Sequence, residues 1–93
     1  MLVCEVALGN MQILTGGDFN DELKKDCDSK KALGRRGPSY DNMLLLPYGA
    51  KIPLGAMQNF NYDEEYQGKV FMNYNEYVVF STDQIRVRYI LRV

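Results

Sequence analysis

The end of the chain alternates between apolar and basic side chains. Residues 84–93 read QIRVRYILRV, where every second residue is apolar and three of the others are arginine: Ile85, Val87, Tyr89, Leu91 and Val93 against Arg86, Arg88 and Arg92. Successive side chains of a strand point to opposite faces, so the pattern predicts a β-strand with one apolar and one basic face. A strand needs a hydrogen-bonded neighbour, and a chain that ends on one is constrained to form sheet.

Other stretches also have strand character. Residues 1–8 are almost continuously apolar, which predicts a strand buried on both faces with Cys4 in the core. Residues 70–80 predict another strand, followed by a turn at 81–83. Two extended pieces around the turn at 48–50, each next to a proline, predict an edge hairpin. These elements predict an α+β fold that is predominantly β.

The remaining segments predict loops. Residues 18–42 are polar and irregular, with at most one or two helical turns in DELKKDCDSKK (21–31). The segment carries six basic residues, which we interpret as a solvated loop, with guidance of a phosphate-rich ligand as the alternative: Lys24, Lys25, Lys30, Lys31, Arg35 and Arg36. Residues 56–69 form an aromatic and acidic loop without an assigned role.

Composition and charge exclude several classes of protein. The 93 residues are 46% apolar and 25% charged with a net charge of −1, which fits one small globular unit. The near-neutral balance lacks the basic surplus of a segment that binds nucleic acid directly. Apolar runs stay well short of the roughly 20 residues that cross a bilayer, and the N-terminus has no basic region typical of a signal peptide. We therefore expect an intracellular segment without direct DNA or membrane binding.

The absence of histidine limits the chemistry. It excludes a Ser-His-Asp triad, a Cys-His pair and any His-ligated metal within this sequence. Cys4 and Cys27 are too few for a structural zinc site, and we interpret both as free thiols in a reducing compartment. The sequence therefore predicts no metal site. Both ends of the chain fall within predicted strands, which is expected of a piece of a larger sheet; a complete small β domain is the alternative.

Five blocks of sequence occur in a familiar order and spacing: LVCEVALGNM (2–11), KALGRRGPS (31–39), KIPLG (51–55), NYNEYVVF (73–80) and QIRVRYILRV (84–93). Together they resemble the C-terminal half of the catalytic domain of the poly(ADP-ribose) polymerase family, whose segments read xLGEVALGN, KGLGK…P, VPLG and YNEYIVY…QVRxRYLLxx. The resemblance covers essentially the whole chain. Ala32 and Cys4 depart from it, since each stands where the family has glycine, and residues 15–28 do not align.

The resemblance implies that residues 1–93 are the C-terminal portion of an ADP-ribosyltransferase catalytic domain. Its fold of packed antiparallel and mixed sheets would be incomplete in this chain alone. The implied substrate is NAD⁺, the reaction is transfer of ADP-ribose to a protein or a growing ADP-ribose chain, and the location is nuclear rather than cytoplasmic. The family's nicotinamide-binding half, with its His and stacking Tyr, would lie before Met1. Most cofactor-binding residues are expected there, on another chain or a precursor, and the isolated chain is expected to be inactive.

The resemblance also implies that Glu76 is the catalytic glutamate. Cleavage between nicotinamide and ribose builds positive charge on the sugar, which a fixed carboxylate stabilises. The carboxylate can also accept a hydrogen bond from the ribose 2′-OH and help deprotonate the acceptor hydroxyl. Outside this motif, an acid on an exposed strand face is ordinarily a solvated residue.

Strand alternation orders the neighbours of Glu76. Tyr74 would share its face and line the acceptor or ribose site, with packing as the alternative. Asn75 and Tyr77 would point to the opposite face, where Tyr77 would belong to the core. A second hypothesis for the whole chain is a catalytically silent fragment or pseudoenzyme that serves as a structural or interaction module, because the His-Tyr half is not visible. Poly versus mono transfer and the acceptor stay open.

Overall fold

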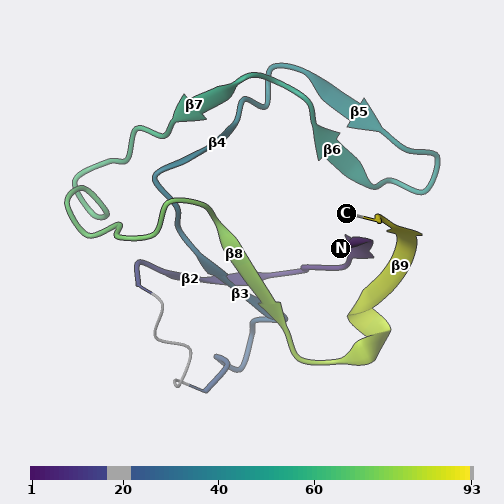
Figure 1. Cartoon of the computed structure of the whole chain (residues 1–93). Helices are drawn as coiled ribbons and strands as arrows, with labels where there is room; N and C mark the ends of the chain where they lie inside the picture. Colours follow the sequence, from purple (N-terminus) through teal and green to yellow (C-terminus); the bar gives the residue numbers. More distant parts are fainter. Residues whose placement is uncertain (17–21, 93) are drawn as a thin grey trace.

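The computed structural model describes residues 1–16 and 22–92, which form short strands in four small sheets (Figure 1). The expectation of a predominantly β chain with several sheets is confirmed. In chain order the elements are β1 (Leu2–Val6), β2 (Met11–Leu14), β3 (Ser29–Ala32), β4 (Arg36–Pro38), β5 (Met43–Leu45), β6 (Lys51–Pro53), β7 (Met57–Asn59), β8 (Glu76–Val79), a 3₁₀ turn (Thr82–Gln84) and β9 (Ile85–Ile90).

The central sheet has the order β2-β3-β8, with β2 parallel and β8 antiparallel to β3. The core of the molecule lies on β3, where Ser29, Lys30 and Ala32 are fully buried and Leu33 follows them. β4 pairs with β7 in a separate two-stranded sheet. The prediction of loops over 18–42 and 56–69 is therefore wrong for β3, β4 and β7, because polar residues are held as strands here by hydrogen bonds to partners distant in sequence.

The possible helical turn in residues 21–31 is not formed in the part that the structure describes. Residue 21 lies outside the described residues. The rest contains a tight turn, closed by the Cys27 N–H donating to the Lys24 carbonyl at 3.0 Å, and then enters β3. With a single apolar edge at Leu23 and Cys27, this stretch has too narrow an apolar stripe to hold a helix. Within residues 1–16 and 22–92, no helix has the length and apolarity that crossing a bilayer requires.

The two ends of the chain pair with each other. β1 and β9 form an antiparallel ribbon, from Leu2 opposite Ile90 to Val6 opposite Ile85, with a bulge after Val3. The N-terminal ammonium donates to the Leu91 carbonyl at 3.0 Å, so the ends lie side by side (Figure 1). Each terminal strand thus finds its required neighbour in the other.

Burial of the N-terminal strand was predicted wrongly. Four of the five residues of β1 are exposed, Cys4 among them, and all six residues of β9 are exposed as well. The ribbon is a single layer with little covering either face, so an apolar sequence does not translate into burial here. Cys4 and the half-buried Cys27 are both free thiols, as predicted.

The edge hairpin and the final turn follow the sequence closely. β5 and β6 pair antiparallel around Gly49, whose φ of 85° is the left-handed conformation that glycine adopts most easily. The turn after β8 is a single 3₁₀ turn, which Ser81 caps by accepting from the Asp83 N–H at 3.2 Å. The strand predicted for 70–80 is shorter in the structure, because regular pairing begins only at Glu76.

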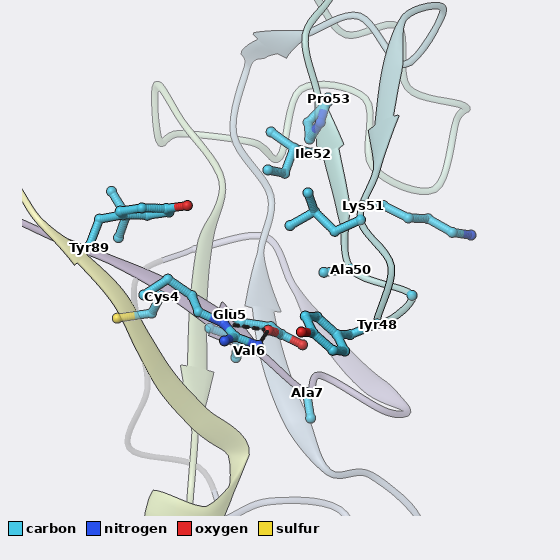
Figure 2. A pocket seen from close by; sticks show the side chains of 14 residues that line it. Cys4, Glu5, Val6, Ala7, Tyr48, Ala50, Lys51, Ile52, Pro53 and Tyr89 are labelled. Carbon is cyan, nitrogen blue, oxygen red and sulfur yellow. Dashed lines mark hydrogen bonds and ion pairs between the residues drawn. The ribbon is translucent and has the colours of Figure 1, made fainter.

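Arg88 joins the two strands of the ribbon by an ion pair and also contacts the hairpin. Arg88 donates from Nε and Nη2 to Glu5 Oε2 at 2.9 and 2.7 Å, and its guanidinium carbon lies 5.2 Å from the centre of the Tyr48 ring. Figure 2 shows Tyr48 beside the dashed lines that reach Glu5. These contacts border a mostly apolar groove of about 470 Å³ between the two elements.

The contacts of Arg88 predict a measurable contribution to stability. We expect Arg88→Met to lower the free energy of unfolding by about 1 kcal/mol, since it removes a half-exposed ion pair and a cation–π contact. Urea unfolding followed by circular dichroism measures the change. Arg92→Met, at an exposed arginine past the end of β9, is the matched control. Equal losses in both variants would attribute the effect to net charge and contradict this role of Arg88.

Candidate active site

Glu76 is the first residue of β8 and lies opposite Ala32 of β3. Directly opposed residues of antiparallel strands share a face, so the Glu76 side chain lies on the face of the fully buried Ala32 methyl. Glu76 itself is exposed. Within the described part of the chain, its carboxylate makes no hydrogen bond or ion pair. The strand pairing therefore fixes the backbone of Glu76, and the carboxylate has no partner among the described residues, which leaves it available to a ligand.

Gly34 holds the backbone that leads into Glu76. Its N–H donates to Asn75 Oδ1 at 2.8 Å, and its carbonyl accepts from the Tyr62 hydroxyl at 2.6 Å. A Cβ at this position would overlap the backbone of Tyr74 and Asn75. Only glycine lets the two segments come this close, so Gly34 sets where the residues before Glu76 run.

Further backbone bonds extend this contact upstream of Glu76. Gly34 forms a parallel bridge with Met72, and the N–H groups of Arg35 and Arg36 donate to the carbonyls of Met72 and Asn73 at 2.9 and 3.0 Å. The segment before β8 is therefore held over several residues by the chain that follows β3. Sequence reasoning missed this arrangement. The signal that could have found it is Gly34 in KALG, a residue that contributed only to the family resemblance.

Tyr74 lies in the bend before β8 and is 57% exposed. Because the strand begins at Glu76, strand alternation does not extend back to Tyr74, and the argument that the two residues share a face does not apply. The structure places Tyr74 two residues before Glu76 on the surface. Its role at an acceptor or ribose site stays a prediction.

Tyr77 is not a core residue, contrary to the prediction. It is 44% exposed and lies opposite Lys31 of β3, whose Nζ is 5.7 Å from the centre of its ring. Alternation along β8 does place it on the face opposite Glu76. Its neighbour across the ladder on that face is Lys31 and not an apolar residue, which fits the exposure.

The six basic residues do not share one environment. Lys24, Lys25, Arg35 and Arg36 are exposed, and Lys31 is half-buried. Lys30, however, is fully buried, with its Nζ 5.8 Å from the centre of the Phe80 ring. The interpretation as a solvated loop is therefore wrong for Lys30. Because Phe80 follows the end of β8, the Lys30 ammonium lies toward the far end of that strand from Glu76.

Tyr62 connects the site to the opposite side of the sheet. Burial raises the pKa of its hydroxyl above 10.0, and the nearby hydroxyls of Tyr40 and Tyr77 raise it further. The group therefore stays protonated at neutral pH and donates to the Gly34 carbonyl.

In the part of the chain that the structure describes, no group of three or more His, Cys, Asp or Glu residues is arranged to hold a metal ion.

The groove beside the Glu5–Arg88 pair lies apart from the predicted site. The apolar groove beside the Glu5–Arg88 pair is lined by residues of the ribbon and the hairpin, and its lining includes neither Glu76 nor Tyr74 (Figure 2). This groove and Glu76 therefore lie in different parts of the chain. The carboxylate of Glu76 has no partner among the described residues, and the backbone at Glu76 is placed by its pairing with Ala32 and by the Gly34 contact just before it.

Comparison with known proteins identifies the family of this chain. All of residues 1–93 match the family described as the poly(ADP-ribose) polymerase catalytic domain, and the chain belongs to that family. Over its full length it is 42% identical to poly(ADP-ribose) polymerase 2-B of Oryza sativa subsp. japonica and 36% identical to poly(ADP-ribose) polymerase 2 of Arabidopsis thaliana. It is 37% identical to poly(ADP-ribose) polymerase 1 of Danio rerio, again over the whole chain. The chain spans 15%, 14% and 9% of the length of these relatives, respectively.

The close approach at Gly34 predicts a strong effect of a single methyl group. We expect Gly34→Ala to lower the free energy of unfolding by about 2–3 kcal/mol, because the added Cβ meets backbone atoms that cannot move aside independently. Urea unfolding measures the loss. Gly16→Ala is the matched control, since a Cβ there meets nothing within 4 Å, and we expect a change within about 0.5 kcal/mol. Equal effects in the two variants would contradict the positional role of Gly34.

The raised pKa of Tyr62 predicts a dependence of stability on alkaline pH. A proton held more tightly in the folded state stabilises the fold fully below the ordinary tyrosine pKa of 10.0, and this stabilisation is lost as the pH rises through the raised value. We expect the stability difference between the wild type and Tyr62→Phe to be constant at neutral pH and to shrink above about pH 10. Urea unfolding across this range measures it, with Tyr89→Phe as the control for removing a phenol from the exposed ribbon. A difference that does not vary with pH would contradict the prediction.

Proposed function

We propose that residues 1–93 are the C-terminal portion of the catalytic domain of an NAD⁺-dependent ADP-ribosyltransferase, with Glu76 as its catalytic carboxylate. Membership in the poly(ADP-ribose) polymerase catalytic domain family supports the activity. The observation that carries the assignment to Glu76 is its free carboxylate in NYNEYVVF, at the start of a strand whose entry is fixed by Gly34. A carboxylate on a strand is held more firmly than one on a loop.

The proposed reaction uses the charge of this carboxylate. The bond between the ribose C1′ and the nicotinamide nitrogen breaks, nicotinamide leaves with the electron pair, and positive charge develops on the sugar. Glu76 stabilises that charge and accepts a hydrogen bond from the ribose 2′-OH. An acceptor hydroxyl then bonds to C1′, and Glu76 takes its proton as a general base. NAD⁺ is a substrate in this scheme, and the proposal includes no metal.

Tyr74 is proposed to line the acceptor or ribose site. It is exposed two residues before Glu76, in a bend whose backbone packs against Gly34. A phenol at such a place offers both a flat ring face and a hydroxyl to a sugar or its acceptor. Because the strand does not include Tyr74, its position depends on the Gly34 contact and not on alternation.

The remaining partners are proposed to come from outside this chain. The residues that bind most of NAD⁺ belong, in this proposal, to the preceding half of the catalytic domain, on a precursor or another chain. The exposed faces of β1 and β9 support this, since they offer apolar area for further sheet or helix to cover. The acceptor is a protein or a growing ADP-ribose chain, and the location is intracellular and nuclear. The chain alone is expected to be inactive.

A second candidate is a catalytically silent structural or interaction module. It is favoured by the lack of histidine in the sequence and by the isolation of Glu76, which has no hydrogen-bonding companion among the described residues. In this alternative the motif is retained, and the exposed ribbon acts as an interaction surface.

A chimera separates the two candidates. The segment of the rice relative that aligns with this chain would be replaced by residues 1–93, and transfer from labelled NAD⁺ would be measured. We expect transfer by the chimera and a loss of about 10²–10³-fold with Glu76→Gln, because the charge that stabilises the sugar is removed. Glu65→Gln, which neutralises an exposed acid in the 56–69 loop, is the matched control.

Each outcome of this experiment is decisive. Full activity of the Glu76→Gln chimera would contradict a catalytic role of Glu76. An inactive chimera beside an active rice parent would favour the silent module. Equal losses from the substitutions at Glu65 and Glu76 would indicate a general charge effect.

A further inference from the structure

A polar hollow lies on the face of the central sheet opposite Glu76. It has a volume of about 340 Å³ and includes Lys31 of β3 and Asn75 in its lining. Lys31 is next to Ala32 in the strand, so its side chain lies on the other face from Ala32 and Glu76. Residues of β7 and of the chain that follows it form much of the other wall. The hollow is therefore separate from the proposed catalytic carboxylate.

The charge of the hollow favours an anion. Among the described residues that line it, Lys31 is the one charged residue, and no Asp or Glu is present. Lys31 is half-buried, and its Nζ lies 5.7 Å from the centre of the Tyr77 ring, which keeps the ammonium on this face. A cation without a competing carboxylate attracts phosphate or carboxylate groups from solution.

The neutral lining favours a flat, polar ring. Asn59 and Asn61 contribute side-chain amides, which can both donate to and accept from a heterocycle, and Asn75, whose Oδ1 accepts from the Gly34 N–H, can still donate. Tyr40 is 53% exposed and offers a ring face for stacking, and the Tyr62 hydroxyl beside it stays neutral. Stacking against an aromatic face combined with amide hydrogen bonds is the usual way to hold a nucleobase.

We propose that this hollow binds a nucleoside 5′-phosphate, with the base against Tyr40 and the asparagine amides and the phosphate on Lys31. The volume falls within the usual range of small-ligand sites, about 300–1,000 Å³. The site goes beyond the proposed transfer function, since it lies across the sheet from Glu76. The same chemistry is presented by a free mononucleotide and by the adenosine phosphate end of ADP-ribose.

The experiment is a titration of the ¹⁵N-labelled chain followed by NMR, with AMP, ADP-ribose, adenosine and inorganic phosphate as probes. We expect AMP or ADP-ribose to shift the side-chain amide signals of Asn61 and Asn75 saturably, and adenosine to bind about tenfold more weakly because it cannot use Lys31. The tighter of the two phosphorylated ligands identifies the source. Because the readout is binding, the result does not depend on whether the chain transfers ADP-ribose.

Variants test the named contacts. We expect Lys31→Met to weaken AMP binding about tenfold while retaining the side-chain stem, and Lys69→Met, at an exposed lysine outside the hollow, to leave it unchanged. Asn61→Ala changes an exposed loop residue and tests the amide wall without disturbing β3. Equal affinity for adenosine and AMP, equal effects of the two lysine variants, or no binding of any probe would overturn the proposal.

Discussion

The contact between the Gly34 backbone and the Tyr74–Asn75 backbone is the constraint on which the candidate site depends. It joins two segments about forty residues apart in the sequence, and the hydrogen bond from the Gly34 N–H to Asn75 Oδ1 closes it. Since β3 ends at Ala32 and β8 begins at Glu76, this contact lies directly beside the first pair of their ladder. Register on one side and close approach on the other then fix the backbone from which the Glu76 side chain projects.

The most buried strand in this chain is polar, and the most apolar strands are exposed. The polar strand SKKA is the centre of the molecule, whereas the apolar strands β1 and β9 are exposed. Lys30 is accommodated in the centre with its ammonium near the Phe80 ring. A strand that is paired on both edges satisfies its backbone groups whatever its side chains are, so hydrogen bonding and not hydrophobicity explains the position of β3.

Sequence reasoning succeeded where the signal was local. The alternation of residues 84–93 predicted β9, although the strand covers only Ile85–Ile90 and Val93 lies outside the described residues. The two extended pieces around residues 48–50 predicted the hairpin. It failed for β3, whose polar residues carry no strand period, and for the burial of Cys4 and Tyr77, because alternation shows which side chains share a face but not whether anything covers that face. Glu76 was found through its motif. The glycine of KALG signals a close approach, but nothing near Gly34 in the sequence identifies Asn75, about forty residues away, as its partner.

The pairing of the first strand with the last has a consequence for how the chain acquires its structure. Closing the ribbon brings together residues as far apart as Leu2 and Ile90, so the contact carries one of the largest loop-closure entropies available to the chain. During synthesis the pairing of β1 with β9 cannot form until residues 85–90 have left the ribosome. Among these residues the ribbon is therefore a late contact, and its two apolar strands stay open to other pairings until it forms.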